Sequence, residues 1–222
     1  MIKTPNASFT QAVTSMKFTG FLLLFCFSLT TSAQVSFGVK GGLNLNFVSV
    51  NADRSSSISQ RHLKLENGIG THLGGFMMVP LSAQAYFKPG VTLIERGAGL
   101  ANDDYRVSLY YADVPLLFQY KITRAFYLEA GPVASGLIAA FEYSAIQQKM
   151  VNVSKAVESF SFGASIGAGY FVTPRLAVTA SVYRSLTMAW NHTLRDESNR
   201  PAGTIDYFPG NVSVGVEYHF KK

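Results

Sequence analysis

The stretch PGNVSVGVEYHFKK, residues 209–222, carries the pattern that decides the fold. From Val212 to Phe220 the positions of one parity are Val, Val, Val, Tyr and Phe, whereas the alternate positions are Ser, Gly, Glu and His. Side chains of a β-strand point to opposite faces in turn, so this period of two predicts a strand with one apolar and one polar face. A strand of a soluble sheet would have the same pattern. The rest of the chain is therefore needed to tell whether the apolar face contacts a protein core or lipid.

The N-terminus has the order of a secretory signal. Lys17 provides a basic start, Phe18–Leu29 is a short apolar run, and Thr31-Ser32-Ala33 supplies small residues for cleavage. A buried core helix is the alternative for this run, which is too short to span a bilayer because a spanning helix needs about 20 residues. We therefore predict a signal peptide over residues 1–33, with Met16 as the natural start.

The remaining residues, 34–222, are predicted to form one domain. The chain has a single cysteine, Cys26, which falls within the predicted signal. The mature domain is therefore expected to hold neither a disulfide nor a thiolate site. It also has no continuous apolar run of helical membrane length, so any membrane insertion would use strands.

The alternation of apolar and polar positions recurs along the whole domain. It predicts strands around residues 36–46, 68–79, 87–93, 110–121, 126–130, 160–170, 176–183 and 209–220. Eight is an even number, as closure of an antiparallel barrel requires. The fold class predicted is therefore all-β, an eight-stranded antiparallel up-and-down transmembrane β-barrel.

The connections between these strands alternate between short and long. Tight links are expected near 80–83, 123–124 and 173–174, and long links over 49–67, 97–104, 141–157 and 187–208. Outer-membrane barrels have short periplasmic turns and longer extracellular loops, so both termini are predicted to be periplasmic. Aromatic residues on the apolar parity gather next to the short turns, where an interfacial girdle belongs: Phe37, Phe87, Tyr120, Phe126, Tyr170, Tyr218 and Phe220.

A secreted β-sandwich or lipocalin-like barrel is the soluble alternative, with the apolar faces as its core. The polar faces are rich in Gly, Ser, Thr and Asn and poor in charge, which favours a membrane barrel with a polar interior. The predicted location is the cell outer membrane, with outer-membrane lipids as the surrounding partner.

Several short motifs resemble the successive strand signatures of the PorT-like outer-membrane β-barrel family. In chain order they are Gly41-Gly42-Leu43-Asn44, Leu73-Gly74-Gly75-Phe76, Phe87-Lys88-Pro89-Gly90-Val91, Asp113-Val114-Pro115-Leu116-Leu117, Tyr127-Leu128-Glu129-Ala130-Gly131-Pro132 and Gly167-Ala168-Gly169-Tyr170. Each motif is weak alone, but their order and spacing are specific, and together they cover about residues 35–220. The resemblance implies an eight-stranded Gram-negative outer-membrane barrel, mostly without assigned activity, and loosely a role near type IX secretion.

Candidate catalytic and metal-binding residues are sparse. No two histidines share a metal-ligand spacing with a Cys, Asp or Glu, so no metal and no cofactor is predicted. A loop-based lipid A acyltransferase would have to use His62 or His192 with Ser55–Ser57 and Asp196, although serine-rich loops are usually only solvated. We therefore predict a non-enzymatic barrel that is structural or binds a partner through its extracellular loops or periplasmic face. A small pore and the acyltransferase stay open as alternatives.

The charge pattern bears on partners and on the lumen. The formal net charge is +6, but the long loops and the adjoining extracellular strand ends, where we also place Arg96, hold ten bases and ten acids, so nucleic-acid binding is not expected. The charged residues with inward parity are Lys40, Lys88, Asp113, Lys121, Glu129 and Glu217. Because closure makes the first and last strands neighbours, we expect Lys40 and Glu217 to pair within a salt-bridge network that plugs the lower lumen. The alternative is that each charge extends separately to periplasmic water.

Overall fold

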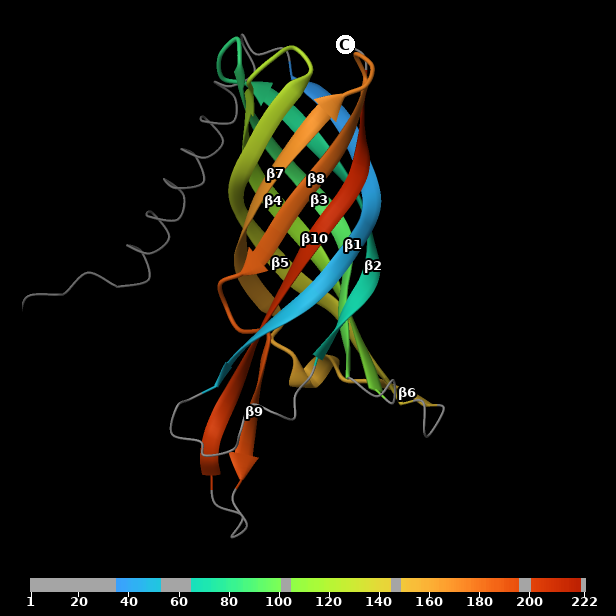
Figure 1. Cartoon of the computed structure of the whole chain (residues 1–222), viewed down its shortest axis with the longest axis vertical. Coiled ribbons are helices and arrows are strands. Elements are labelled where there is room, and N and C mark those ends of the chain that lie inside the picture. The colour runs from blue at the N-terminus through green and yellow to red at the C-terminus, as the bar shows by residue number, and fades with distance from the viewer. Residues whose placement is uncertain (1–34, 53–64, 101–104, 145–148, 196–200, 221–222) are drawn as a thin grey trace, which may run out of the picture. The chain divides into compact units, whose positions relative to one another are not determined.

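The computed structural model describes residues 35–52, 65–100, 105–144, 149–195 and 201–220. Eight strands form the wall of a closed antiparallel barrel (Figure 1). They are β1 (Ser36–Ala52), β2 (Leu65–Pro80), β3 (Ala85–Leu100), β4 (Tyr105–Lys121), β5 (Phe126–Ser144), β7 (Phe160–Phe171), β8 (Leu176–Ser185) and β10 (Pro201–His219). The predicted eight-stranded barrel is confirmed.

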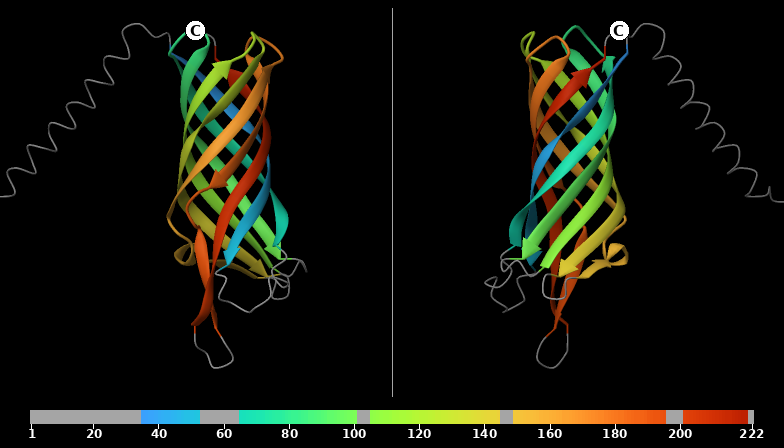
Figure 2. Two further views of the ribbon diagram at one scale, coloured as in Figure 1. Left: turned by 60° about the vertical axis from the view of Figure 1, so that its left-hand side comes forward. Right: turned by 90° about the vertical axis from the view of Figure 1, so that its right-hand side faces the viewer.

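The barrel closes between its first and last strands. β1 pairs with β10 from Gly38 opposite His219 to Ala52 opposite Ile205, and every other wall strand pairs with its sequence neighbour in the wall. Figure 2 shows the tilted strands running round a continuous wall from two further directions. No helix in the described part of the chain is long and apolar enough to cross a membrane.

Three short turns join wall strands at the end where the C-terminus lies (Figure 1). They occupy residues 81–84, 122–125 and 172–175, close to the predicted positions. In two of them a threonine hydroxyl, on Thr123 and Thr173, accepts hydrogen bonds from the backbone N–H groups at the start of the next strand, at 2.9 to 3.3 Å. This side-chain bond satisfies donors that the turn would leave free, which explains the tight links.

The opposite end differs from the prediction of long loops. Two wall strands continue beyond the barrel into hairpins, because β6 (Lys149–Asn152) pairs with β5 and β9 (Trp190–Arg195) pairs with β10. A short 3₁₀ helix, η2 (Ser154–Ala156), follows β6. Much of the sequence assigned to loops is therefore strand. Strands of 16 to 19 residues exceed the 9 to 11 that a tilted transmembrane strand needs, so they extend past the bilayer.

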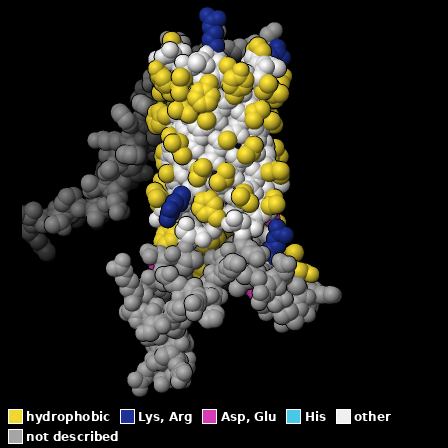
Figure 3. Space-filling model, in the orientation of Figure 1, with side chains coloured by type: hydrophobic (Ala, Val, Ile, Leu, Met, Phe, Trp, Pro, Cys, Tyr) yellow, Lys and Arg dark blue, Asp and Glu magenta, His cyan; other side chains and the backbone are white. Residues whose placement is uncertain are grey.

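The outer face of the wall is apolar and the inner face is largely polar. Leu43, Leu73, Val91 and Ile166 are each more than half exposed on the outside, whereas Asn44, Thr92 and Ser161 are buried inside. Figure 3 shows hydrophobic side chains over the whole height of the visible wall. An apolar surface of this extent suits lipid rather than water, and the inward and outward parities follow the prediction.

A β-bulge changes the inward parity near the far end of β5. Tyr110 lies opposite Ala139 but Tyr111 lies opposite Leu137, so Ile138 has no partner residue on β4. Between the start of β5 and the bulge, the even-numbered residues face outward. Beyond the bulge, Ala140 is fully buried inside while Tyr143 is exposed. The extra residue thereby turns Ala140 into the interior of the barrel at the end with the hairpins.

Aromatic rings pack on inward-facing glycines of the neighbouring strand. A Cβ atom built on Gly169 would lie 2.1 Å from the Tyr127 ring, and one on Gly163 would lie 2.5 Å from the Tyr183 ring. These glycines therefore provide the space that lets two large rings lie flat inside a narrow barrel.

Candidate functional site

Three charged side chains from different strands meet inside the lumen near the short turns, the end of the barrel that we call lower although Figure 1 draws it at the top. Lys88 of β3 donates hydrogen bonds to Glu129 of β5 at 2.8 Å and to Glu217 of β10 at 2.5 Å. Lys88 is 1% exposed. We call Lys88, Glu129 and Glu217 the lower cluster. One ammonium thus links strands on opposite parts of the wall across the lumen.

Aromatic rings enclose the lower cluster. The Tyr127 hydroxyl donates to Glu217 at 2.8 Å, and the Lys88 ammonium lies 4.6 Å from the centre of the Phe76 ring. The His219 ring packs between Phe76 and Phe171, with both centroid distances 5.0 Å. Cation–π and hydrogen-bond contacts of this kind compensate part of the cost of burying charge.

A second charged group lies further from the short turns. Arg96 of β3 makes two hydrogen bonds to the carboxylate of Asp113 on β4, one of them at 3.1 Å, and its Nε donates to Asn211 at 3.2 Å. The guanidinium carbon lies 4.0 Å from the centre of the Tyr183 ring and 5.2 Å from that of Tyr111. We call Arg96 and Asp113 the upper cluster. A paired, two-bond geometry is the arrangement in which a buried arginine is best stabilised.

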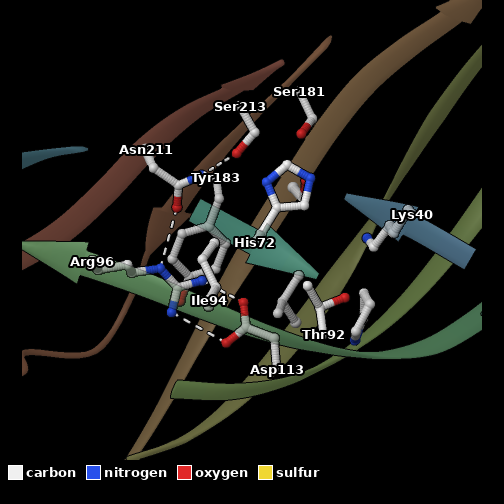
Figure 4. Close-up of a pocket in the computed structure, with 13 residues that line it drawn as sticks. Lys40, His72, Thr92, Ile94, Arg96, Asp113, Ser181, Tyr183, Asn211 and Ser213 are labelled. Atoms are coloured by element: carbon white, nitrogen blue, oxygen red, sulfur yellow. Dashed lines mark hydrogen bonds and ion pairs between the residues drawn. The ribbon is translucent and has the colours of Figure 1, made fainter. Parts of the chain in front are cut away.

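Hydrogen bonds continue from the upper cluster toward β1 and β2 (Figure 4). Asn211 donates to the Ser213 hydroxyl at 2.7 Å, Ser213 donates to Asn44 Oδ1 at 2.7 Å, and His72 Nδ1 lies 2.8 Å from the same oxygen. These contacts join β10, β1 and β2 in one polar chain. Such a connected network holds the inner side chains in a single arrangement.

A small cavity of about 60 Å³ adjoins this polar chain. Lys40, His72, Thr92 and Ser181 line it together with residues of the upper cluster (Figure 4). The Thr92 hydroxyl is buried without a hydrogen-bond partner in the described part of the chain. A space of this size holds only a few water molecules, so it is no continuous channel.

An apolar layer lies beyond the upper cluster, toward the hairpins. Ile94, Leu109, Tyr111 and Ala140 form a buried group, with Val153 and Val157 from the η2 segment packed against it. The backbone N–H of Ala140 donates to the Ser154 hydroxyl at 2.8 Å, and the N–H of Val153 donates to the Ala140 carbonyl at 2.9 Å. These two hydrogen bonds hold the segment after β6 against β5. Their partner on β5 is Ala140, which faces the interior because of the bulge.

The six residues expected to form an interior network divide into three groups. Lys88, Glu129 and Glu217 meet in the lower cluster, while Asp113 pairs higher up with Arg96. Lys40 lies opposite Glu217 in the β1–β10 register but makes no ion pair within 4.0 Å in the described residues, so the expected Lys40–Glu217 pair is wrong. Lys88 takes its place, because its side chain reaches Glu217 from across the lumen.

Lys121 also stays outside the ion pairs. Its ammonium donates to the Tyr86 hydroxyl at 3.3 Å and lies 4.4 Å from the centre of that ring. Arg96 is the inner charge that sequence reasoning missed, because it was grouped with the extracellular strand ends. Its parity on β3 is the same as that of Lys88 and Thr92, and this signal would have placed it inside.

Most of the residues suggested for an acyltransferase lie outside the described part of the chain, so the suggestion stays untested. His192 lies on β9, while His62, Ser55–Ser57 and Asp196 lie outside the described residues. Among the residues that the structure describes, no group of three His, Cys, Asp or Glu side chains is arranged to hold a metal ion.

Comparisons with known proteins give a family and several similar folds. A family model described as "Outer membrane protein beta-barrel domain" matches residues 27–190. Similar solved structures include Ail of Yersinia pestis in complex with the heparin analogue sucrose octasulfate (15% identity, 84% of this chain and 99% of that chain, TM-score 0.46). Neisserial surface protein A (14%, 84% and 99%, 0.49) and OprG of Pseudomonas aeruginosa (13%, 84% and 96%, 0.43) are others. No curated protein sequence matches the chain.

Proposed function

The chain belongs to the outer membrane protein beta-barrel domain family, and from this premise we propose that it is a non-enzymatic barrel with a sealed lumen that holds binding elements at the cell surface. The protein is located in the outer membrane. The short turns then face the periplasm and the hairpins face outward, as in other outer-membrane barrels.

The filled lumen is the observation that carries this proposal. The lower cluster, the upper cluster and the apolar layer follow one another along the barrel axis, each with buried side chains. An eight-stranded barrel has an interior that side chains can fill, and the cavity of about 60 Å³ is too small to connect its two ends. A permanent pore is therefore the less favoured function.

Exposed apolar side chains near the β5–β6 hairpin support a binding role outside the cell. Tyr143 and Met150 are opposite each other in the hairpin, and both are exposed, as is Val151. Apolar groups beyond the lipid are suited to contact with another macromolecule. The PorT-like resemblance and the association with protein secretion that it implies belong to the same proposal.

Conductance of the refolded protein in a planar lipid bilayer tests the sealed lumen. We expect no stable openings from the wild type. The variant Lys88→Ala/Glu129→Ala/Glu217→Ala, combined with Arg96→Ala/Asp113→Ala, removes both clusters and is expected to conduct if it folds. Stable openings of the wild type would show a pore instead. Comparison of secreted proteins in cells with and without the gene tests the secretion link separately.

A further inference from the structure

The periplasmic end of the barrel carries cations that have no acidic partner. Lys121 ends β4, Arg124 lies in the turn after it, and Arg175 lies in the turn between β7 and β8. The three short turns contain no Asp or Glu. Among the described residues, no carboxylate lies within 4.0 Å of these three side chains, whereas Lys88 and Arg96 inside the barrel are both paired.

An open cavity of about 680 Å³ lies at this end. Lys121, Arg175 and His219 line it on the polar side, and Phe171 provides an aromatic surface on the inner face. Tyr218 and Phe220 lie at its rim, on the outward parity. The Lys121 ammonium lies 5.7 Å from the centre of the Phe171 ring, within the inner face of the barrel. Figure 3 shows basic side chains projecting from the same end. The mouth therefore combines unpaired positive charge with apolar walls.

The size and chemistry of the mouth narrow the class of ligand. The volume is far larger than an inorganic anion needs. Such an ion also has no apolar group that could contact the aromatic surface of the cavity. Phospholipid headgroups surround the outer face, whereas Lys121 lies on the inward parity and is separated from them by the wall.

We propose that the periplasmic mouth binds an acidic peptide segment of a periplasmic protein, with Lys121 and Arg175 holding carboxylates and the Phe171 ring contacting an apolar side chain. Lys121 is half-buried and Arg175 is exposed. Recognition of carboxylates by basic side chains at a pocket is a recurrent mode of peptide binding. This inference concerns the opposite end from the hairpins and does not depend on whether the lumen conducts.

Binding of a fluorescein-labelled peptide, Asp-Glu-Phe-Asp-Glu, to refolded protein in nanodiscs of zwitterionic lipid tests the proposal. We expect saturable binding by fluorescence anisotropy that weakens with added salt, and no binding of Asn-Gln-Phe-Asn-Gln. The variant Lys121→Glu/Arg175→Glu is expected to lose at least about tenfold in affinity, since two attractive contacts become repulsive.

Two further variants separate this result from general effects. Lys155→Glu reverses one charge at an exposed position on η2, at the far end of the barrel, and is expected to bind the peptide like the wild type. Lys121→Gln/Arg175→Gln serves if the reversed variant does not fold, with folding checked by the migration of unboiled samples. Equal affinity of wild type and mouth variants would overturn the proposal. So would retention of anionic phospholipid by the wild type, lost in the mouth variants, without peptide binding.

Discussion

Replacement of Lys88 by methionine tests the lower cluster directly. At an effective dielectric constant of about 20, two unit charges 2.8 Å apart attract each other by roughly 6 kcal/mol. Lys88 has two such partners, but burial of each ion costs several kcal/mol, which offsets much of the attraction. Methionine keeps the length and the contact with Phe76, and it leaves Glu129 and Glu217 buried without a cation. We expect the free energy of unfolding to fall by about 3 to 5 kcal/mol.

Urea titration of the protein refolded in lipid vesicles measures this change, with the migration of unboiled samples as the readout. Lys121→Met is the matched control, because its ammonium contacts Tyr86 but no carboxylate, and it is expected to cost less than about 1 kcal/mol. Adding Glu129→Gln and Glu217→Gln to Lys88→Met is expected to restore much of the lost stability. If Lys88→Met and Lys121→Met cost the same small amount, the lower cluster does not stabilise the barrel.

Three further changes test other parts of the structure. Val214→Arg on the lipid face is expected to lower the free energy of unfolding by about 2 to 4 kcal/mol in the same titration. Ser213→Arg is expected to lower it by at least as much, because the lumen is filled, and a clearly smaller loss for Ser213→Arg would contradict a filled lumen. A double-mutant cycle of Lys40 and Glu217 is expected to give a smaller coupling energy than a cycle of Lys88 and Glu217, whose charged groups are in contact, and equal values would mean that Lys40 pairs with Glu217 as closely as Lys88 does. Gly169→Val is expected to reduce the refolded fraction on gels, because its side chain would overlap the aromatic ring that packs there.

The period of two predicted which side chains face the lumen, because alternation follows directly from strand geometry. The inward position of Lys88, Glu129 and Glu217 needs only their parity. Their pairing was not predictable in the same way. Neighbouring strands suggested Lys40 with Glu217, whereas Lys88 reaches Glu217 across the lumen from β3, and contacts across a barrel depend on tilt and on side-chain length.

The end of the barrel with the hairpins was less predictable than the wall. Residues 190–195 and 201–208 were assigned to a loop, although they belong to β9 and β10. A hairpin outside the bilayer has no lipid-facing side, so its sequence lacks the apolar alternation on which the prediction depended. The β5 bulge at Ile138 also reverses parity without any marker in the local sequence.

The position of Glu217 on the final strand has a consequence for the order of folding. Lys88 and Glu129 belong to β3 and β5 and can meet as soon as those strands associate, but Glu217 arrives only when β10 closes against β1. That closure joins residues nearly the whole domain apart in sequence, the slowest kind of contact to form. Until then Lys88 has one of its two carboxylates, so the cluster is completed by the same event that seals the wall. A chain lacking its last strand would lose the seam and the second counter-ion together.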